Sequence, residues 1–252
     1  MISNFIYKLF SILPISTKVR ILDKIDLSTH LDYKIPIPIK IHSSWSYYRR
    51  NCCRKEPETV DWLENTLRED DVFLDIGANV GAYSYIAASI MSKGSVLCVE
   101  PSFSTFKTLC DNILHLEESF KDVAFIPFYN ALGDKECMID FNFSSISSGA
   151  GRHGGDSYEA SLKTTAIKLD TLIKQFELPN PTVVKIDVDG PELNVIQGAY
   201  ETFTGKSVRS VLIEVDNENS EGVNHLMYSY GFTILSSHPR GDTENRIYIK
   251  KS

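Results

Sequence analysis

The pattern of apolar and polar residues is most regular between residues 71 and 101. A short, mostly apolar run from Val72 to Ile76 is typical of a strand buried on both faces of a parallel sheet. Apolar residues then recur at helical spacing from Val80 to Met91, and a second apolar run covers residues 96–99. The pattern predicts a strand, a tight turn, a helix and a second strand, which together form the repeating unit of parallel sheets.

The same reasoning extends this unit into an α/β domain, since helical spacing and short apolar runs continue along the chain. The predicted helices cover residues 58–67, 103–114, 171–176, a segment beginning near Pro191, and 219–230. The further predicted strands cover residues 123–129, 182–186 and 208–215, followed by an antiparallel hairpin of 232–235 and 246–249. Residues 137–143 and 164–169 are predicted to pair antiparallel. We therefore expect a mostly parallel α/β sheet of seven strands.

Residues 1–55 differ from this domain in their pattern. Residues 1–14 place apolar side chains along a helix that is too short and too interrupted to span a bilayer. Two interpretations stay open: this helix packs on the domain or on a second subunit, or it lies on a membrane surface. Residues 31–42 alternate apolar and polar, contain Pro36 and Pro38, and are expected to be extended or to lie at a sheet edge. Residues 45–55 place aromatic side chains beside cations, which could contact the substrate by stacking on a sugar or binding a phosphate, or form a linker. We divide the chain into an N-terminal helical extension, residues 1–55, and one domain, residues 56–252.

Glycines and carboxylates meet at the turn between the first two strands. Gly77 and Gly81 have no Cβ, so the chain can turn sharply and a ligand can approach the backbone, with free N–H groups of the helix N-terminus facing it. Glu100 follows Asp75 by about 25 residues, near the offset of about 20 at which doubly wound folds place an acid on a ribose. Asp75 stands where a dinucleotide fingerprint has a glycine, and it would repel a diphosphate. S-adenosylmethionine, which has a ribose and cationic groups but no phosphate, suits this pattern better.

Three sequence blocks carry a family resemblance: DIGANVG followed by VEP, NALGD at residues 130–134, and KIDVDGPELNVIQGA at residues 185–199. They resemble the motifs of the FkbM family of class I S-adenosylmethionine-dependent methyltransferases, over roughly residues 56–215. The resemblance implies a Rossmann-like sheet and methyl transfer to a hydroxyl group of a saccharide, such as a cell-surface glycan or glycolipid, or of a secondary metabolite. The cofactor residues that it implies are Asp75, Gly77, Ala78, Asn79 and Gly81 at the methionine end, Glu100 and Pro101 at the ribose, and Asn130, Ala131 and Leu132 at the adenine.

Carboxylates also end two later strands, and the carboxyl ends of parallel strands border the ligand site of such sheets. Asp187 follows the strand of residues 182–186, and Glu214 lies at the end of the strand of residues 208–215. Either side chain could take a proton from an acceptor hydroxyl. His153, in a loop rich in Gly and Ser, is a third candidate base, with an exposed and mobile histidine as the alternative.

Asp187, Asp189 and Glu192 lie within six positions and allow three interpretations. They could form a Mg²⁺ site, combine a base with sugar-binding acids, or cap the helix that begins near Pro191. We favour Asp187 as an acceptor-site carboxylate, assign no metal ligand, and leave Mg²⁺ as a minor alternative.

Composition narrows the function classes. Lys and Arg number 26 against 33 Asp and Glu, a net charge of −7, so a nucleic acid would meet a repelling surface. The five cysteines form no C-x-x-C pair, and no export signal is evident, which favours a reducing cytoplasm, with contact at the inner face of the membrane left open. Two rival functions remain: a non-catalytic scaffold with the methyltransferase fold and, less favoured, an NAD(P)-dependent oxidoreductase.

Overall fold

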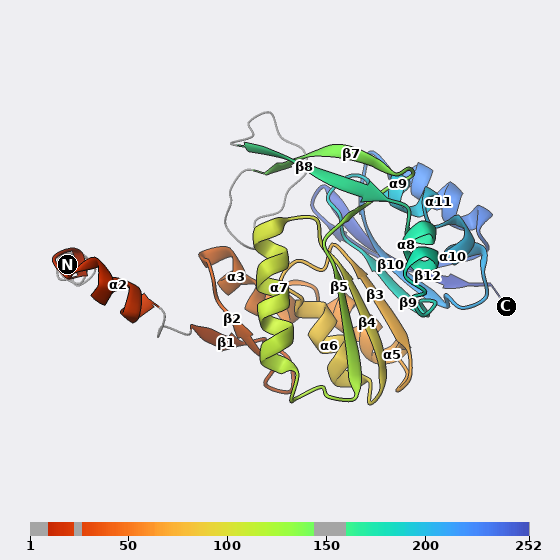
Figure 1. The fold of residues 1–252 in the computed structure, drawn as a ribbon. Coiled ribbons are helices and arrows are strands. Elements are labelled where there is room, and N and C mark those ends of the chain that lie inside the picture. Colours follow the sequence, from red (N-terminus) through yellow and green to blue (C-terminus); the bar gives the residue numbers. More distant parts are fainter. Residues whose placement is uncertain (1–9, 23–26, 144–159, 252) are drawn as a thin grey trace.

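The computed structural model describes residues 10–22, 27–143 and 160–251. Its central sheet has seven strands in the order β11-β12-β10-β9-β3-β4-β5. The five strands from β10 to β5 run parallel, and β12 pairs antiparallel with both β10 and β11. This arrangement confirms the predicted sheet and its antiparallel end (Figure 1). The strands are β3 (Val72–Ile76), β4 (Gly94–Val99), β5 (Val123–Phe128), β9 (Val183–Ile186), β10 (Ser210–Asp216), β11 (Phe232–Arg240) and β12 (Thr243–Lys250).

Helices cover both faces of the sheet, because successive strand residues point to opposite sides. On β3, Phe73 enters one apolar core and Leu74 enters the other. The Phe73 core includes helices α5 (Pro57–Thr66), α6 (Ala82–Ile90) and α7 (Phe103–Leu116). The Leu74 core includes α8 (Leu169–Gln175), α9 (Glu192–Gln197), α10 (Tyr200–Thr204) and α11 (Ser220–Ser229). Asp75 follows Leu74 and therefore faces the α6 side.

A second sheet lies beside the first and joins β6 (Ala131–Leu132), β8 (Ala160–Ile167) and β7 (Cys137–Phe143) in that order. The antiparallel pairing of β7 with β8 confirms the pairing predicted for residues 137–143 and 164–169. The parallel pairing of Ala131 and Leu132 with Ala166 and Ile167 holds the segment after β5 in place.

The C-terminal hairpin is longer than predicted. Residues 236–240 read as a polar turn in the sequence, but they belong to β11, and Arg240 is paired with Thr243. The turn needs only two residues because Gly241 adopts a positive φ of 74°. The hairpin therefore carries Arg240 to the end of the sheet where β10 ends.

Residues 28–55 pack against the domain. β1 (Ser28–His30) and β2 (Pro38–Lys40) form the expected short extended pair, and the Lys40 backbone N–H donates to Asn112 Oδ1 on α7 over 2.6 Å. Residues 44–55, for which the sequence predicted no regular structure, are helical, as α3 (Ser44–Tyr48), the 3₁₀ turn η1 (Arg49–Asn51) and α4 (Cys52–Lys55). The boundary at residue 55 stays a proposal.

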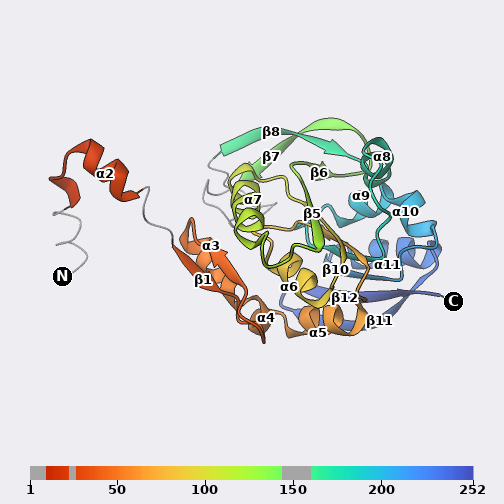
Figure 2. The same cartoon turned by 60° about the horizontal axis from the view of Figure 1, so that its bottom comes forward.

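The chain before β1 holds α2 (Ile15–Leu22), which stands apart from the sheets in both views (Figures 1 and 2). The helix predicted within residues 1–14 falls mostly outside the described residues. Within the described residues, no helix is both long enough and apolar enough to cross a membrane.

Candidate active site at the carboxyl edge of the sheet

The turn from β3 into α6 is built so closely against β9 that residue 77 must be glycine. Gly77 has a φ of +77°, and a Cβ there would lie 1.8 Å from the Asp187 carbonyl oxygen. Asn79 also has a positive φ, 52°, a conformation that asparagine tolerates better than most residues. The N–H groups of Gly77 and Ala78 both donate to the Val99 carbonyl, over 2.9 and 3.1 Å. These two amides therefore join β3 to β4, and only the N–H groups at the start of α6 (Ala82–Ile90) stay in the prediction of amides that face a ligand.

Glu100 lies directly after β4 and is 6% exposed. Its carboxylate accepts the backbone N–H of Asn79 over 2.9 Å and that of Ser102 over 2.8 Å. Burial raises the pKa of Glu100 to about 7, against the lowering effect of these two N–H groups. Each oxygen keeps a lone pair, so the carboxylate can still accept from two neighbouring hydroxyl groups, as on a ribose.

A small cavity opens at the ends of β3 and β4. It brings together five residues of the predicted cofactor set, which are far apart in the sequence. Four residues that sequence reasoning did not assign, Ile76, Val99, Val188 and Pro191, complete the lining. The predicted residues in the lining are Gly77, Pro101, Asn130, Ala131 and Leu132.

Asp75 lies on β3, two residues before Gly77, and is 1% exposed. Ser84 on α6 donates its hydroxyl to Asp75 Oδ2 over 2.6 Å, and Oδ1 has no hydrogen-bond partner among the described residues. Burial raises the pKa of Asp75, and the nearby Lys185 ammonium opposes this effect. The other turn glycine, Gly81, packs against α6, since a Cβ there would lie 2.3 Å from the Tyr85 ring and hydroxyl.

Asp187 and Glu214 come together beside a buried cation. Lys185, 1% exposed, lies 2.7 Å from Asp187 Oδ2 through its Nζ. Although burial raises the pKa of Asp187, the Lys185 charge and a hydrogen bond from Glu214 hold this pKa well below its usual range. Burial and the Asp187 charge raise the pKa of Glu214 to about 7, and Thr243 donates its hydroxyl to Glu214 Oε1 over 2.9 Å. Below pH 7 Glu214 therefore carries the proton of the pair while Asp187 is ionised, and near pH 7 this proton is lost.

Further charged side chains lie between this pair and the start of α5. Glu56, 2% exposed, lies 2.8 Å from the Arg240 guanidinium, and its charge also acts on Lys185. The Arg49 charge favours ionisation of both Asp187 and Glu100, so η1 faces this edge of the sheet. Lys185 could have been predicted as a neighbour of Asp187, because residues two positions apart in a strand point to the same face of the sheet.

The remaining predicted residues lie elsewhere. His153 is outside the described residues. Glu192 accepts the Gly190 N–H over 2.7 Å, as a cap would, while its Oε2 is buried without a partner among the described residues. Asp187, Asp189 and Glu192 do not form a metal-sized cluster in the described part of the chain.

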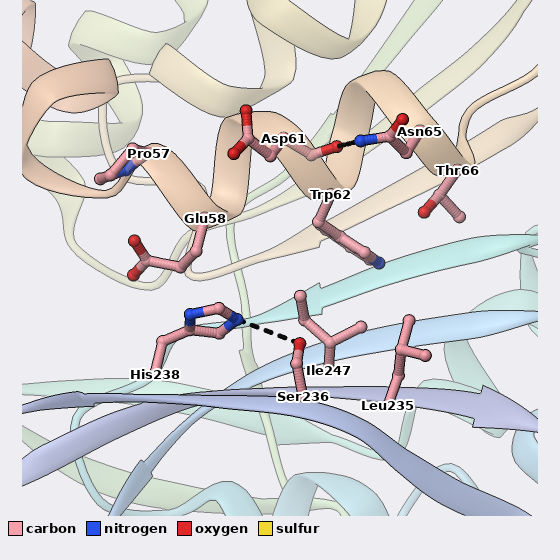
Figure 3. Close-up of a pocket in the computed structure, with 10 residues that line it drawn as sticks. All are labelled: Pro57, Glu58, Asp61, Trp62, Asn65, Thr66, Leu235, Ser236, His238 and Ile247. Carbon is pink, nitrogen blue, oxygen red and sulfur yellow. Dashed lines mark hydrogen bonds between the residues drawn. The ribbon is translucent and has the colours of Figure 1, made fainter.

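A larger cavity, about 420 Å³, lies between α5 and β11. Figure 3 shows Glu58 and His238 at one end and Leu235 and Thr66 at the other. We place the candidate site at the carboxyl edge of the sheet, because the positive-φ turn, Glu100 and the Asp187 cluster lie at this edge and the smaller cavity opens beside the turn.

Known proteins with related sequences and folds show the family of this chain. Residues 75–234 match the family model described as the methyltransferase FkbM domain. The hexuronic acid methyltransferase AglP of Haloferax volcanii is 31% identical over 175 residues, which are 69% of this chain and 68% of that protein. The structure of a methyltransferase FkbM from Methylobacillus flagellatus shares the fold, with a TM-score of 0.53 and 13% identity over 83% of this chain and 56% of that one.

Proposed function

We propose that this chain, which belongs to the FkbM methyltransferase family, transfers a methyl group from S-adenosylmethionine to an oxygen atom of a saccharide. The observation that carries this proposal is the meeting of the Gly77 turn, Glu100 and the Asp187–Glu214 pair at one edge of the sheet. AglP, whose name states a hexuronic acid as its substrate, supports a sugar acceptor. The net charge of −7 supports an acceptor other than a nucleic acid.

The residues around the small cavity fit the proposed cofactor. Glu100 has lone pairs for the two ribose hydroxyls, and Gly77, which packs on the Asp187 backbone, lines the same cavity. The segment of residues 130–132 lines the same cavity and would contact the adenine. S-adenosylmethionine supplies a methyl carbon activated by the adjacent sulfonium. The chain's residues have to hold the acceptor oxygen in line with it and exclude water.

The Asp187–Glu214 pair would manage the proton of an acceptor hydroxyl. While Glu214 is protonated, the ionised Asp187 can accept a hydrogen bond from the hydroxyl and orient it. Once that proton is lost, the pair can take the hydroxyl proton as the new bond to carbon forms. The charged groups that act on the pair are Lys185, Glu56 and Arg49. We expect the rate of transfer to rise with pH and to level off above about 7.

Isothermal titration with S-adenosylmethionine and S-adenosylhomocysteine, with and without EDTA, tests the cofactor. We expect both to bind with micromolar affinity and EDTA to have no effect. Failure of both ligands to bind would overturn the proposal and leave a non-catalytic scaffold as the better account.

Transfer from radiolabelled S-adenosylmethionine to hexuronate-containing oligosaccharides tests the acceptor. A hexuronic acid offers hydroxyl and carboxylate oxygens, so the product must be treated with mild alkali. We expect an alkali-stable ether, because a carboxylate acceptor would need no proton acceptor such as the Asp187–Glu214 pair. Asp187→Asn is the matched variant, and it should lower turnover with little change in S-adenosylhomocysteine affinity.

A further inference from the structure

Three potential metal ligands meet on residues 28–55, away from the cluster around Asp187. Asp32 follows β1, and Cys52 and Cys53 begin α4. One carboxylate oxygen and the two sulfurs all lie within 4.8 Å of one another. Within the described residues, this is the one group of three or more His, Cys, Asp and Glu side chains close enough to share a metal ion. We call it the Asp32–Cys52–Cys53 site.

The distances suit a tetrahedral ion of the zinc class. The sulfur atoms of Cys52 and Cys53 are 3.9 Å apart. Two sulfurs bound at about 2.3 Å to a tetrahedral ion lie roughly 3.8 Å apart, so the pair needs almost no movement. Among the described residues, the Cys52 thiol, 5% exposed as a residue, has its single hydrogen-bonding contact with Cys53. The buried sulfur is therefore directed at the other ligand and not at a backbone acceptor.

The carboxylate of Asp32 is held in position by the backbone. Its two oxygens accept the N–H groups of Cys53 over 2.9 Å and of Arg54 over 3.0 Å. Each oxygen keeps a lone pair for a metal, and these N–H groups restrict the carboxylate as outer contacts of a metal ligand do. Asp32 is exposed and Cys53 partly so, which leaves a path for the ion from solvent.

We propose that Asp32, Cys52 and Cys53 bind one zinc-class divalent cation, with two thiolates, one carboxylate oxygen and a solvent molecule as the four ligands. Two thiol protons leave to solvent when the metal binds, and no electron is transferred. The two sulfurs favour a borderline-soft ion over Mg²⁺ or Ca²⁺.

A metal here would cross-link the two ends of residues 28–55. It would join Asp32, next to the β1–β2 pair, to α4, whose Cys52 carbonyl accepts the Tyr83 hydroxyl over 3.3 Å. The Tyr83 ring lies 5.0 Å from Lys185 Nζ, so α4 is one residue removed from the cluster at the end of the sheet. The metal thus stabilises the segment that carries Arg49 and leads into Glu56.

The test is a Zn²⁺ titration of the full chain, kept reduced with a phosphine, in weak buffer so that released protons are counted. We expect one Zn²⁺ per chain with micromolar or tighter affinity, about two protons released per ion, and no comparable response to Mg²⁺. Melting at Zn²⁺ concentrations about 100-fold above the dissociation constant should occur about 5 °C higher or more. Hydrogen exchange of residues 28–55 should slow on metal addition.

Variants separate this site from other thiols. Cys53→Ser and Asp32→Asn should each weaken Zn²⁺ binding at least about tenfold, and the asparagine keeps one of the two acceptors that the N–H groups of Cys53 and Arg54 use. Cys110→Ser, on α7 and also partly buried, is the matched control and should bind Zn²⁺ as the wild-type chain does. No Zn²⁺ binding by the wild-type chain, or equal binding by Asp32→Asn and Cys53→Ser, would overturn the proposal. Circular dichroism checks that each variant is folded. If Cys53→Ser does not fold, the Zn²⁺ affinity of Asp32→Asn alone tests the proposal.

Discussion

Replacing Gly77 by alanine tests whether the close approach of β3 and β9 shapes the candidate site. A Cβ at residue 77 would start 1.8 Å from the Asp187 carbonyl oxygen, so an ordinary contact of 3.4 Å requires a shift of about 1.6 Å. The shift has to come from backbone, because both groups belong to the paired ends of strands. The Asp187 side chain, which sits on the moving residue, would be displaced with it.

Gly241 provides the matched control. Its φ of +74° is close to the +77° of Gly77, but a Cβ there would meet no atom within 4 Å. Gly241→Ala therefore measures the strain of a left-handed alanine alone, about 1–2 kcal/mol. Gly77→Ala adds the cost of overpacking, which is typically about 1–3 kcal/mol. The free energy of unfolding should thus fall by about 1–3 kcal/mol more in Gly77→Ala than in Gly241→Ala.

Urea unfolding followed by circular dichroism measures the two losses, and calorimetry measures S-adenosylhomocysteine affinity. Since a misplacement of about 1 Å can cost roughly 100-fold in rate, Gly77→Ala should also weaken binding or turnover at least about tenfold, while Gly241→Ala should not. Equal unfolding free energies in the two variants, together with unchanged ligand affinity, would refute the contact between β3 and β9 as the reason for a glycine.

Three further predictions concern buried charges. Glu100→Ala should weaken S-adenosylhomocysteine binding by roughly 10- to 100-fold, because hydrogen bonds to a charged group are worth about 1.5–3 kcal/mol; unchanged calorimetric affinity would remove Glu100 from the site. Lys185→Met should lower the unfolding free energy in urea by about 3–5 kcal/mol, against about 0–1 kcal/mol for the exposed Lys163→Met; similar losses would contradict the burial argument. Burial raises the pKa of Glu214 to about 7, so its contribution to stability is complete below the ordinary glutamate pKa and is lost as pH rises through 7. Glu214→Gln, which imitates the protonated form, should match the wild-type chain in thermal melting at about pH 4, below the ordinary glutamate pKa, and exceed it at about pH 8; a difference independent of pH would exclude the raised pKa.

The part of the site that could be predicted is the part that local sequence determines. The β3 strand, the Gly77 turn and α6 follow from apolar periodicity and from glycines, which act on neighbouring residues. Asp187 and Glu214 were placed at the same edge because parallel strands end together. The position of each residue at this edge could be predicted from the pattern of its own strand alone. The pairing of β9 with β10 then brings the two residues into contact.

The rest of the candidate site depends on contacts between segments that are far apart in the sequence. The periodicity of a single sequence carries no information about such contacts. Glu56 lies 129 positions before Lys185 (185 minus 56), and its partner Arg240 was assigned to a turn. That turn assignment failed because polar residues 236–240 were read as loop, whereas an edge strand next to α5 accommodates them. The helices of residues 44–55 escaped prediction because none exceeds five residues, too short for a periodic pattern.

The buried charges explain why this edge of the sheet cannot be treated as ordinary core. An isolated buried ammonium would lose its proton, yet the carboxylates of Asp187, Asp75 and Glu56 raise the pKa of Lys185 despite the opposing effect of burial. The carboxylates in turn need that cation, so removing any one charge leaves the others uncompensated. Replacing such a cluster by apolar residues is often neutral or stabilising, which means that stability alone does not account for it. The arrangement makes sense if an ionised carboxylate must be held ready at the end of β9, where the Gly77 turn packs directly on the Asp187 backbone.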